Sequence, residues 1–190
     1  MAYGKLTVVS GPMYAGKTTE LLKRILWARN GEMKAVLVVK PSFDNRYSAT
    51  KIVSHDGLSV DAMSVTSWDD VGYLLDDAEL VCFDEVQFFQ EPHFKPEHNG
   101  AQVSIIAAVK NLLQRGVDVV CSGLDMDWRG DPFAITASLM AMADEVLKST
   151  ANCTTCGRPA AKTFKKVSND EKVELGATDL YEARCNDHWG

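Results

Sequence analysis

The stretch that decides the fold of this chain reads Leu6-Thr7-Val8-Val9-Ser10-Gly11-Pro12-Met13-Tyr14-Ala15-Gly16-Lys17-Thr18. From Gly11 on it fits the phosphate-loop pattern G-x4-G-K-[ST], and it lies between a strand-like and a helix-like segment. In that setting, backbone N–H groups and the positive end of the helix dipole would cradle a triphosphate. Lys17 would reach the β- and γ-phosphates, and the Thr18 hydroxyl would bind Mg2+. The alternative is an ordinary glycine turn before a helix.

Strand-like and helix-like segments alternate through residues 1–148. Apolar residues at helical spacing predict the helices, and continuous apolar runs predict strands that are covered on both faces. The predicted helices are 17–29, a short one after Ser67, 103–114 and 133–143, and the predicted strands are 6–10, 35–39, 80–83 and 117–121. This alternation indicates an α/β fold of the phosphate-loop NTPase type, with a mostly parallel sheet and helices on both faces. Ligands of such sheets bind beyond the carboxyl ends of the strands.

The composition and charge of the chain disfavour some classes of binding partner. The chain has 190 residues, a formal net charge of -6 and a sequence pI of about 5.2. This acidic balance argues against nucleic acid or an anionic membrane as the main partner, because phosphate groups bind basic surfaces. The N-terminus lacks an apolar signal-peptide region, and no apolar run approaches the ~20 residues that span a bilayer. We therefore expect a soluble, cytoplasmic protein.

Two acidic residues, Asp84 and Glu85, follow the apolar strand 80–83. Asp84 matches the acid that helps to hold Mg2+ in phosphate-loop enzymes. Glu85, at the carboxyl end of the strand, would accept the proton of an attacking hydroxyl or water. Arg46 and Arg129 each follow a predicted strand and would balance the remaining phosphate charge, since a guanidinium suits multi-oxygen contacts. For both arginines a plain surface role is the alternative.

The C-terminal part carries a metal-ligand pattern. Cys153-x2-Cys156 is followed, after 28 intervening residues, by Cys185-x2-His188. Two pairs with this spacing suit a tetrahedral Cys3His zinc site, and four protein ligands leave no position for water, so the predicted zinc is structural. We predict a zinc-binding domain with a long loop at residues 149–190. Unrelated cysteines or a transient disulfide are the alternatives.

Other reactive side chains have plain interpretations. Cys82 and Cys121 lie in apolar strand-like runs, so we expect small buried hydrophobes. Glu91 to Gly100 is predicted to be a loop, with His93 and His98 as solvated histidines, because no metal-ligand spacing accompanies them.

Together these motifs resemble the thymidine kinase family of the cellular, vaccinia-like and bacterial type, also called type II. The resemblance covers nearly the whole chain. It rests on the segment from Gly11 to Leu21, on Asp44-Asn45-Arg46-Tyr47, Asp84-Glu85-Val86-Gln87-Phe88-Phe89, Gly123-Leu124-Asp125 with Pro132-Phe133, and the Cys3His set. It implies an ATP-dependent kinase that phosphorylates the 5′-hydroxyl of thymidine in deoxynucleoside salvage, in support of DNA synthesis.

The resemblance also implies residue roles. Glu85 is the catalytic base, and Thr18 and Asp84 are linked to magnesium. The ATP-binding residues are Gly11, Pro12, Met13, Tyr14, Ala15, Gly16, Lys17, Thr18, Arg46, Asp84, Glu85, Val86 and Gln87. The loop between the zinc-ligand pairs resembles a lasso that closes over the nucleoside. The stretch of this lasso that binds the nucleobase contains Leu175, Gly176, Ala177 and Tyr181. Met13, Leu124 and Thr163 line the pocket for the thymine methyl group, and Phe88, Trp128 and Phe133 form aromatic walls beside Glu85.

The implied cofactors are ATP, Mg2+ and structural Zn2+. The resemblance further implies thymidine triphosphate as a feedback inhibitor and a homo-oligomer, either a tetramer or a dimer.

The chain departs from the family pattern at several positions, none of which is a reacting group. The departures are Trp128, Gly130, Ala134, Ala177 and Asn186, together with a longer loop around 91–100. They bear on fine substrate specificity, so a kinase for another deoxynucleoside such as deoxyuridine stays open. A nucleic-acid-stimulated ATPase with a zinc ribbon is the alternative that the acidic pI disfavours. A nucleotide-binding protein without turnover is a further alternative, which the complete set of predicted reacting groups disfavours.

Overall fold

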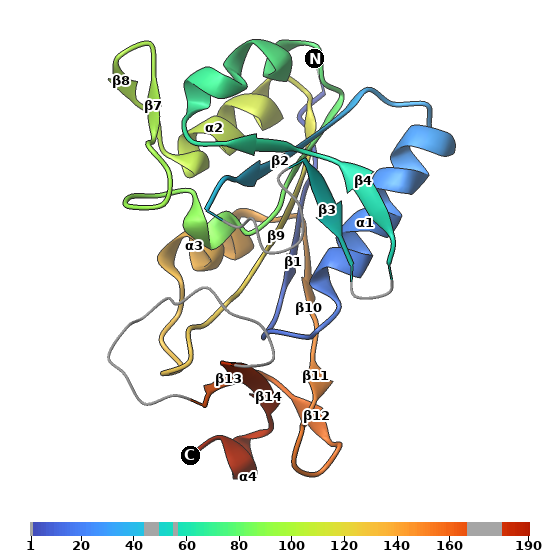
Figure 1. Cartoon of the computed structure of the whole chain (residues 1–190). Coiled ribbons are helices and arrows are strands. Elements are labelled where there is room, and N and C mark those ends of the chain that lie inside the picture. Colours follow the sequence, from blue (N-terminus) through green and yellow to red (C-terminus); the bar gives the residue numbers. More distant parts are fainter. Residues whose placement is uncertain (1, 44–49, 55–56, 167–179) are drawn as a thin grey trace.

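A computed structural model describes residues 2–43, 50–54, 57–166 and 180–190 (Figure 1). Six strands form a parallel sheet in the order β10-β1-β9-β6-β2-β5. They are β1 (Leu6–Ser10), β2 (Val36–Pro41), β5 (Met63–Val65), β6 (Leu80–Phe83), β9 (Asp118–Gly123) and β10 (Glu145–Lys148). The predicted α/β class with a mostly parallel sheet is confirmed.

Helices cover both faces of this sheet, as their apolar spacing predicted (Figure 1). The helices are α1 (Lys17–Asn30), α2 (Ile105–Gln114) and α3 (Ala134–Met142). Leu22 and Ile25 of α1 pack with Val9 and the other side chains of one face, whereas Ile105 and Val109 of α2 pack on the opposite face. Among the described residues, no helix is long and apolar enough to cross a bilayer.

Several short elements escaped prediction. The helix expected after Ser67 is a pair of 3-10 helices, η1 (Trp68–Asp70) and η2 (Gly72–Asp76). The segment Glu91 to Gly100, expected to be a loop, contains β7 (Glu97–His98), which forms a hairpin with β8 (Ala101–Gln102) directly after it. A second hairpin consists of β3 (Lys51–Val53) and β4 (Ser59–Asp61). Such strands are too short to leave a periodic pattern in the sequence.

The C-terminal elements lie beyond the end of the sheet at which the loop after β1 is found (Figure 1). They are β11 (Ala151–Asn152), β12 (Pro159–Ala160), β13 (Lys162–Lys165), β14 (Tyr181–Arg184) and α4 (Asn186–Trp189). In the part of the chain that the structure describes, these strands pair with one another and not with the large sheet. That pairing supports the predicted domain boundary after residue 148, which stays a prediction.

The register of the sheet brings the predicted reacting groups to one edge. Ser10 at the end of β1 pairs with Gly123 at the end of β9, and Phe83 at the end of β6 pairs with Cys121. Because all three strands run in parallel, the residues that follow them leave the sheet side by side. The loops that begin at Gly11, Asp84 and Leu124 therefore share the carboxyl edge, where α/β sheets bind ligands.

Candidate active site

The loop from Gly11 to Thr18 has the backbone of a phosphate cradle. Gly11 has a φ of 145°, Tyr14 of 66° and Gly16 of 73°, so the loop curls in front of α1. A side chain at Gly11 would collide with the carbonyl oxygen of Ser149, which explains why only glycine fits there. The Lys17 ammonium donates to the Pro12 carbonyl at 2.7 Å, which keeps its positive charge over the loop. This arrangement suits a bound polyphosphate.

Asp84 and Glu85 directly follow the last residue of β6, at the carboxyl edge of the sheet. Asp84 is buried, and its N–H donates to the Val39 carbonyl at 3.0 Å. Its carboxylate, with the Thr18 hydroxyl in the first turn of α1, supplies the oxygen donors that Mg2+ prefers. Glu85 has a φ of 51°, a left-handed conformation that is uncommon outside glycine. Such strain costs on the order of 1–3 kcal/mol and clusters at active sites.

Gln87 connects Glu85 to the loop that follows β9. Its side chain is fully buried in η3 (Val86–Phe88). The Nε2 donates to Glu85 Oε2 at 2.6 Å, and Oε1 accepts the Leu124 N–H at 3.0 Å. The resemblance predicted Gln87 only as part of an ATP segment, and this double contact escaped sequence reasoning. A glutamine within an otherwise apolar run was the available signal, since a buried amide requires partners.

Gln87→Glu is expected to place a second carboxylate against Glu85. Like charges at this distance favour protonation, so we expect the acidic limb of the kcat/KM profile to move up by about one pH unit or more. Activity at neutral pH should fall accordingly. The measurement is a pH–rate profile of the kinase reaction that the resemblance implies, with Gln114→Glu, at an exposed position at the end of α2, as the control. An acidic limb at the wild-type position would contradict this role of Gln87.

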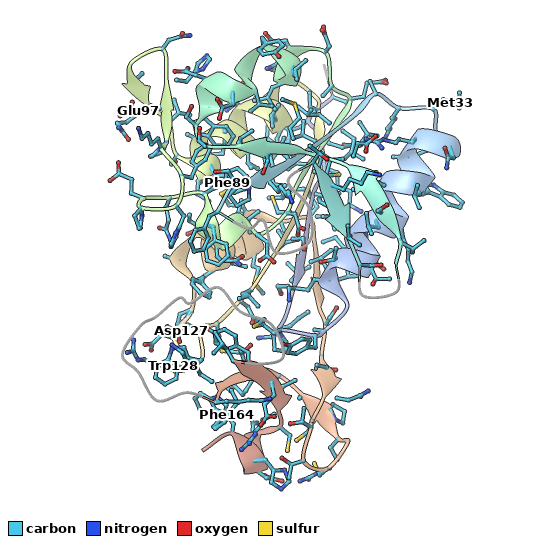
Figure 2. All side chains as sticks on the ribbon, in the orientation of Figure 1. Met33, Phe89, Glu97, Asp127, Trp128 and Phe164 are labelled. Carbon is cyan, nitrogen blue, oxygen red and sulfur yellow. The ribbon has the colours of Figure 1, made fainter. Side chains whose placement is uncertain are left out.

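The loop after β9 holds three of the predicted nucleoside-pocket residues. Leu124 is fixed by Gln87, and the buried Phe133 donates its N–H to the Asp125 carbonyl at 2.9 Å at the start of α3. The Trp128 ring lies under the Arg129 guanidinium, 4.6 Å from centroid to Cζ. Figure 2 shows Trp128 beside the C-terminal strands, where Lys165 of β13 lies 5.7 Å from its ring.

Gly130, one of the departures from the family pattern, has a packing reason. It has a φ of 87°, and an added Cβ would come within 2.8 Å of the Trp189 ring. The Trp189 indole N–H in turn donates to the Thr163 carbonyl at 3.1 Å. Glycine at this position therefore lets the loop after β9 pack closely against α4.

The phosphate loop also contacts the C-terminal strands. The Met13 N–H donates to Thr163 Oγ1 at 3.1 Å, so two residues predicted for the thymine methyl pocket adjoin each other. The Tyr14 hydroxyl donates to the Tyr181 carbonyl at 3.3 Å. Four other predicted site residues, Arg46, Leu175, Gly176 and Ala177, lie outside the described residues.

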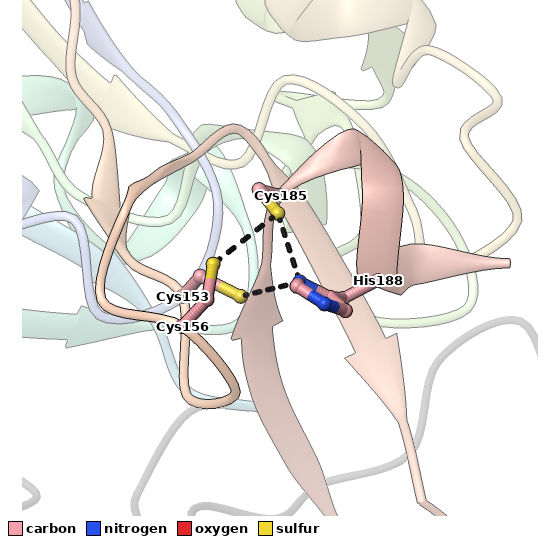
Figure 3. Close-up of side chains that lie close together, drawn as sticks. All are labelled: Cys153, Cys156, Cys185 and His188. Carbon is pink, nitrogen blue, oxygen red and sulfur yellow. Dashed lines mark hydrogen bonds between the residues drawn. The ribbon is translucent and has the colours of Figure 1, made fainter.

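The Cys3His set converges as its spacing predicted (Figure 3). The ligand atoms of Cys153, Cys156, Cys185 and His188 all lie within 4.8 Å of one another. The Cys156 and Cys185 sulfurs are 3.8 Å apart, and His188 Nδ1 lies 3.2 Å from Cys185 and 3.7 Å from Cys153. Tetrahedral zinc with bonds of about 2.0–2.3 Å spans edges of roughly 3.5–3.8 Å, so zinc fits this set.

The surroundings of the cluster favour the thiolate of Cys153, whereas burial raises the pKa of the Cys185 thiol. Backbone N–H groups of Cys185, Cys156 and Thr155 point at the Cys153 sulfur and lower the pKa of its thiol to about 5. Arg158 Nε donates to the Cys156 sulfur at 3.4 Å. Because the thiolate is the form that binds metal, these donors prepare the site for zinc.

Two cysteines and two histidines outside the Cys3His set were expected to have plain structural or solvent-exposed roles. Cys82 and Cys121 are fully buried as predicted, and burial raises the pKa of the Cys82 thiol to about 12. His98 lies partly exposed at 3.1 Å from Asp69. His93 was expected to be solvated, and that prediction is wrong: its ring packs against Phe43, because the segment around it is anchored to the core.

Comparison with known proteins gives the family. The family model for thymidine kinase matches residues 4–189. A thymidine kinase of Pseudothermotoga lettingae is 39% identical over 186 residues, which cover 97% of this chain and 94% of that protein. A thymidine kinase of Thermococcus kodakarensis is 36% identical over 202 residues, covering 97% of this chain and 93% of that protein. The chain belongs to the thymidine kinase family.

Proposed function

We propose that this chain transfers the γ-phosphate of ATP to the 5′-hydroxyl of thymidine, giving thymidine monophosphate and ADP in deoxynucleoside salvage. One observation carries the proposal. Gln87 ties Glu85 to Leu124, which begins the loop after β9, the strand that lies between β6 and β1 with its phosphate loop. Glu85, the proposed proton acceptor, therefore shares the carboxyl edge of the sheet with the phosphate loop and with the proposed nucleoside loop, which supports phosphoryl transfer between them.

The chain's own groups account for binding of the phosphate donor. The N–H groups from Tyr14 to Thr18 would surround the β- and γ-phosphates, and Lys17 would exchange its contact with Pro12 for the phosphate oxygens. Thr18 and Asp84 would hold Mg2+, which neutralises charge on the β- and γ-oxygens when bound. Arg46 is proposed as a further phosphate contact.

Glu85 is the proposed general base. It takes the proton of the 5′-hydroxyl as that oxygen approaches the γ-phosphorus in line. Its hydrogen bond from Gln87 Nε2 at 2.6 Å fixes the orientation of the carboxylate. The strained backbone at Glu85 is consistent with selection for this position rather than for stability.

The nucleoside is proposed to lie between the sheet edge and the C-terminal unit. Phe88, Trp128 and Phe133 would flank it, with Met13, Leu124 and Thr163 at the base methyl and Leu175 to Ala177 with Tyr181 as a lasso. Zinc on the Cys3His set would hold the ends of the lasso together. Closure over the nucleoside would exclude water and limit ATP hydrolysis.

Turnover of labelled thymidine with Mg-ATP tests the proposal. Zinc-loaded protein is expected to form thymidine monophosphate. If well-folded protein forms none of this product, the assignment is wrong. Competition with deoxyuridine distinguishes a thymidine kinase from a kinase for another deoxynucleoside. ATP hydrolysis that DNA stimulates, without nucleoside phosphorylation, would instead support an ATPase.

From the family resemblance we also propose a homo-oligomer, a tetramer or a dimer, and feedback inhibition by thymidine triphosphate. Light scattering after size exclusion tests the first proposal. Inhibition of thymidine turnover by thymidine triphosphate tests the second.

A further inference from the structure

The segment after η3 is firmly anchored to the core, although its sequence reads as a loop. The N–H groups of His93 and Phe94 donate to the Gln90 carbonyl at 2.9 and 3.0 Å. The Phe94 ring is buried, with its centroid 4.9 Å from that of Trp68 and 5.0 Å from that of Phe89. These contacts fix the backbone on both sides of His93, and they dictate where its side chain lies.

The His93 ring completes a cluster of three rings. Its centroid lies 3.8 Å from that of Phe43 and 5.3 Å from that of Phe88. Phe43 and Phe88 meet edge to face, with centroids 5.1 Å apart. Such arrangements are favourable for aromatic pairs. Burial lowers the pKa of the His93 imidazole, so the ring is neutral at neutral pH and packs as an aromatic ring.

The two phenylalanines belong to segments that follow neighbouring parallel strands, β2 and β6, at the carboxyl edge of the sheet. Phe88 belongs to η3, the element that carries Gln87, and is a proposed wall of the nucleoside pocket. Phe43 follows β2 and directly precedes the segment that carries Arg46 in the sequence. A ring that packs on both phenylalanines therefore bears on the proposed nucleoside wall through Phe88.

We propose that His93 is a positioning residue of the nucleoside site, whose ring holds Phe43 and Phe88 in place. The inference rests on the proposed function, because it takes Phe88 to be a wall of the nucleoside pocket. His93 acts through the two phenylalanines and takes no part in proton transfer. Loss of the His93 ring should therefore weaken nucleoside binding and leave the rate of the chemical step unchanged.

Two substitutions separate this role from general damage. His93→Ala removes the ring and is expected to raise the KM for thymidine roughly 3- to 10-fold, with kcat and the KM for ATP within about 2-fold of wild type. His93→Phe keeps an aromatic ring and is expected to restore the KM for thymidine. His98→Ala, in the same segment but on the hairpin, is the matched control and should leave all three constants unchanged.

The outcomes are distinguishable. An unchanged KM in His93→Ala, an equal loss in His93→Phe, or a parallel loss for ATP would overturn the positioning role. Calorimetry of thymidine binding to the same proteins separates this inference from the proposed function. Wild-type protein that binds thymidine without turnover defeats the kinase assignment, and the variants still test His93. Wild-type protein that does not bind thymidine overturns both.

Discussion

Glu85→Gln is expected to lower kcat for thymidine phosphorylation by roughly 10^2- to 10^4-fold, the usual contribution of a general base. The substitution keeps the shape of the side chain and its Cβ, so the left-handed backbone at this position has the same strain as before. The amide oxygen still accepts the hydrogen bond from Gln87 Nε2. What disappears is the negative charge and with it the ability to accept the substrate proton.

Steady-state kinetics with labelled thymidine measure this effect, and the KM for ATP should stay near its wild-type value. Glu97→Gln is the matched control, because Glu97 projects from the β7–β8 hairpin away from the proposed site (Figure 2). Thermal unfolding of both variants verifies folding. A kcat within about 3-fold of wild type in Glu85→Gln would remove this residue from the base role.

The central elements of the fold were predictable because both of their faces are buried. β1 and β6 are buried along their whole lengths, and their continuous apolar runs indicated them directly. β10 has only two apolar residues, Val146 and Leu147, and none of its residues is fully buried because it is an edge strand, so its short run was not recognised. β5 is the opposite edge and has three residues, too few for a periodic signal.

The residues of the candidate site were predictable from the sequence where they form local patterns, and their contacts with one another were not. The phosphate loop, Asp84 and Glu85 are local patterns, each next to a predictable strand. The contacts that join them are long-range: Met13 and Thr163 are 150 residues apart in the sequence, and Gln87 and Leu124 are 37 apart. Periodicity carries no information about such pairs. His93 shows the same limit, because its environment depends on Phe43, which comes from another strand's end.

Removal of zinc is expected to unfold the C-terminal unit while the α/β part stays folded. The buried apolar cluster of this unit is small, consisting of Ala151, Cys153, Ala160, Ala183 and Cys185, and three of its members are alanine. Units of this size rarely fold on such a core without a metal or disulfides. Structural zinc supplies about 10–16 kcal/mol in isolated zinc-finger peptides, which exceeds what this cluster provides.

Unfolding of the C-terminal unit should also disturb the proposed active site, because two hydrogen bonds connect this unit to the phosphate loop. Thr163 Oγ1 accepts the Met13 N–H, and the Tyr181 carbonyl accepts the Tyr14 hydroxyl, so unfolding removes two contacts that hold the phosphate loop. We therefore expect thymidine turnover to be lost and ATP binding to weaken. The large apolar clusters on the two sheet faces contain none of the C-terminal residues that the structure describes, so the α/β part should retain a cooperative unfolding transition.

Cys185→Ser and treatment of wild-type protein with a chelator test this expectation by independent routes. Metal analysis should find about one zinc per chain in wild type and in the control Cys82→Ala, and little in Cys185→Ser. Cys82 is the appropriate control because it is a buried thiol of the sheet, remote from the cluster. Restoration of activity by added zinc distinguishes metal loss from damage. A zinc-free protein with the Tm and the thymidine KM of wild type would show that the Cys3His set serves another purpose, since a structural metal cannot be removed without loss of the structure that it holds.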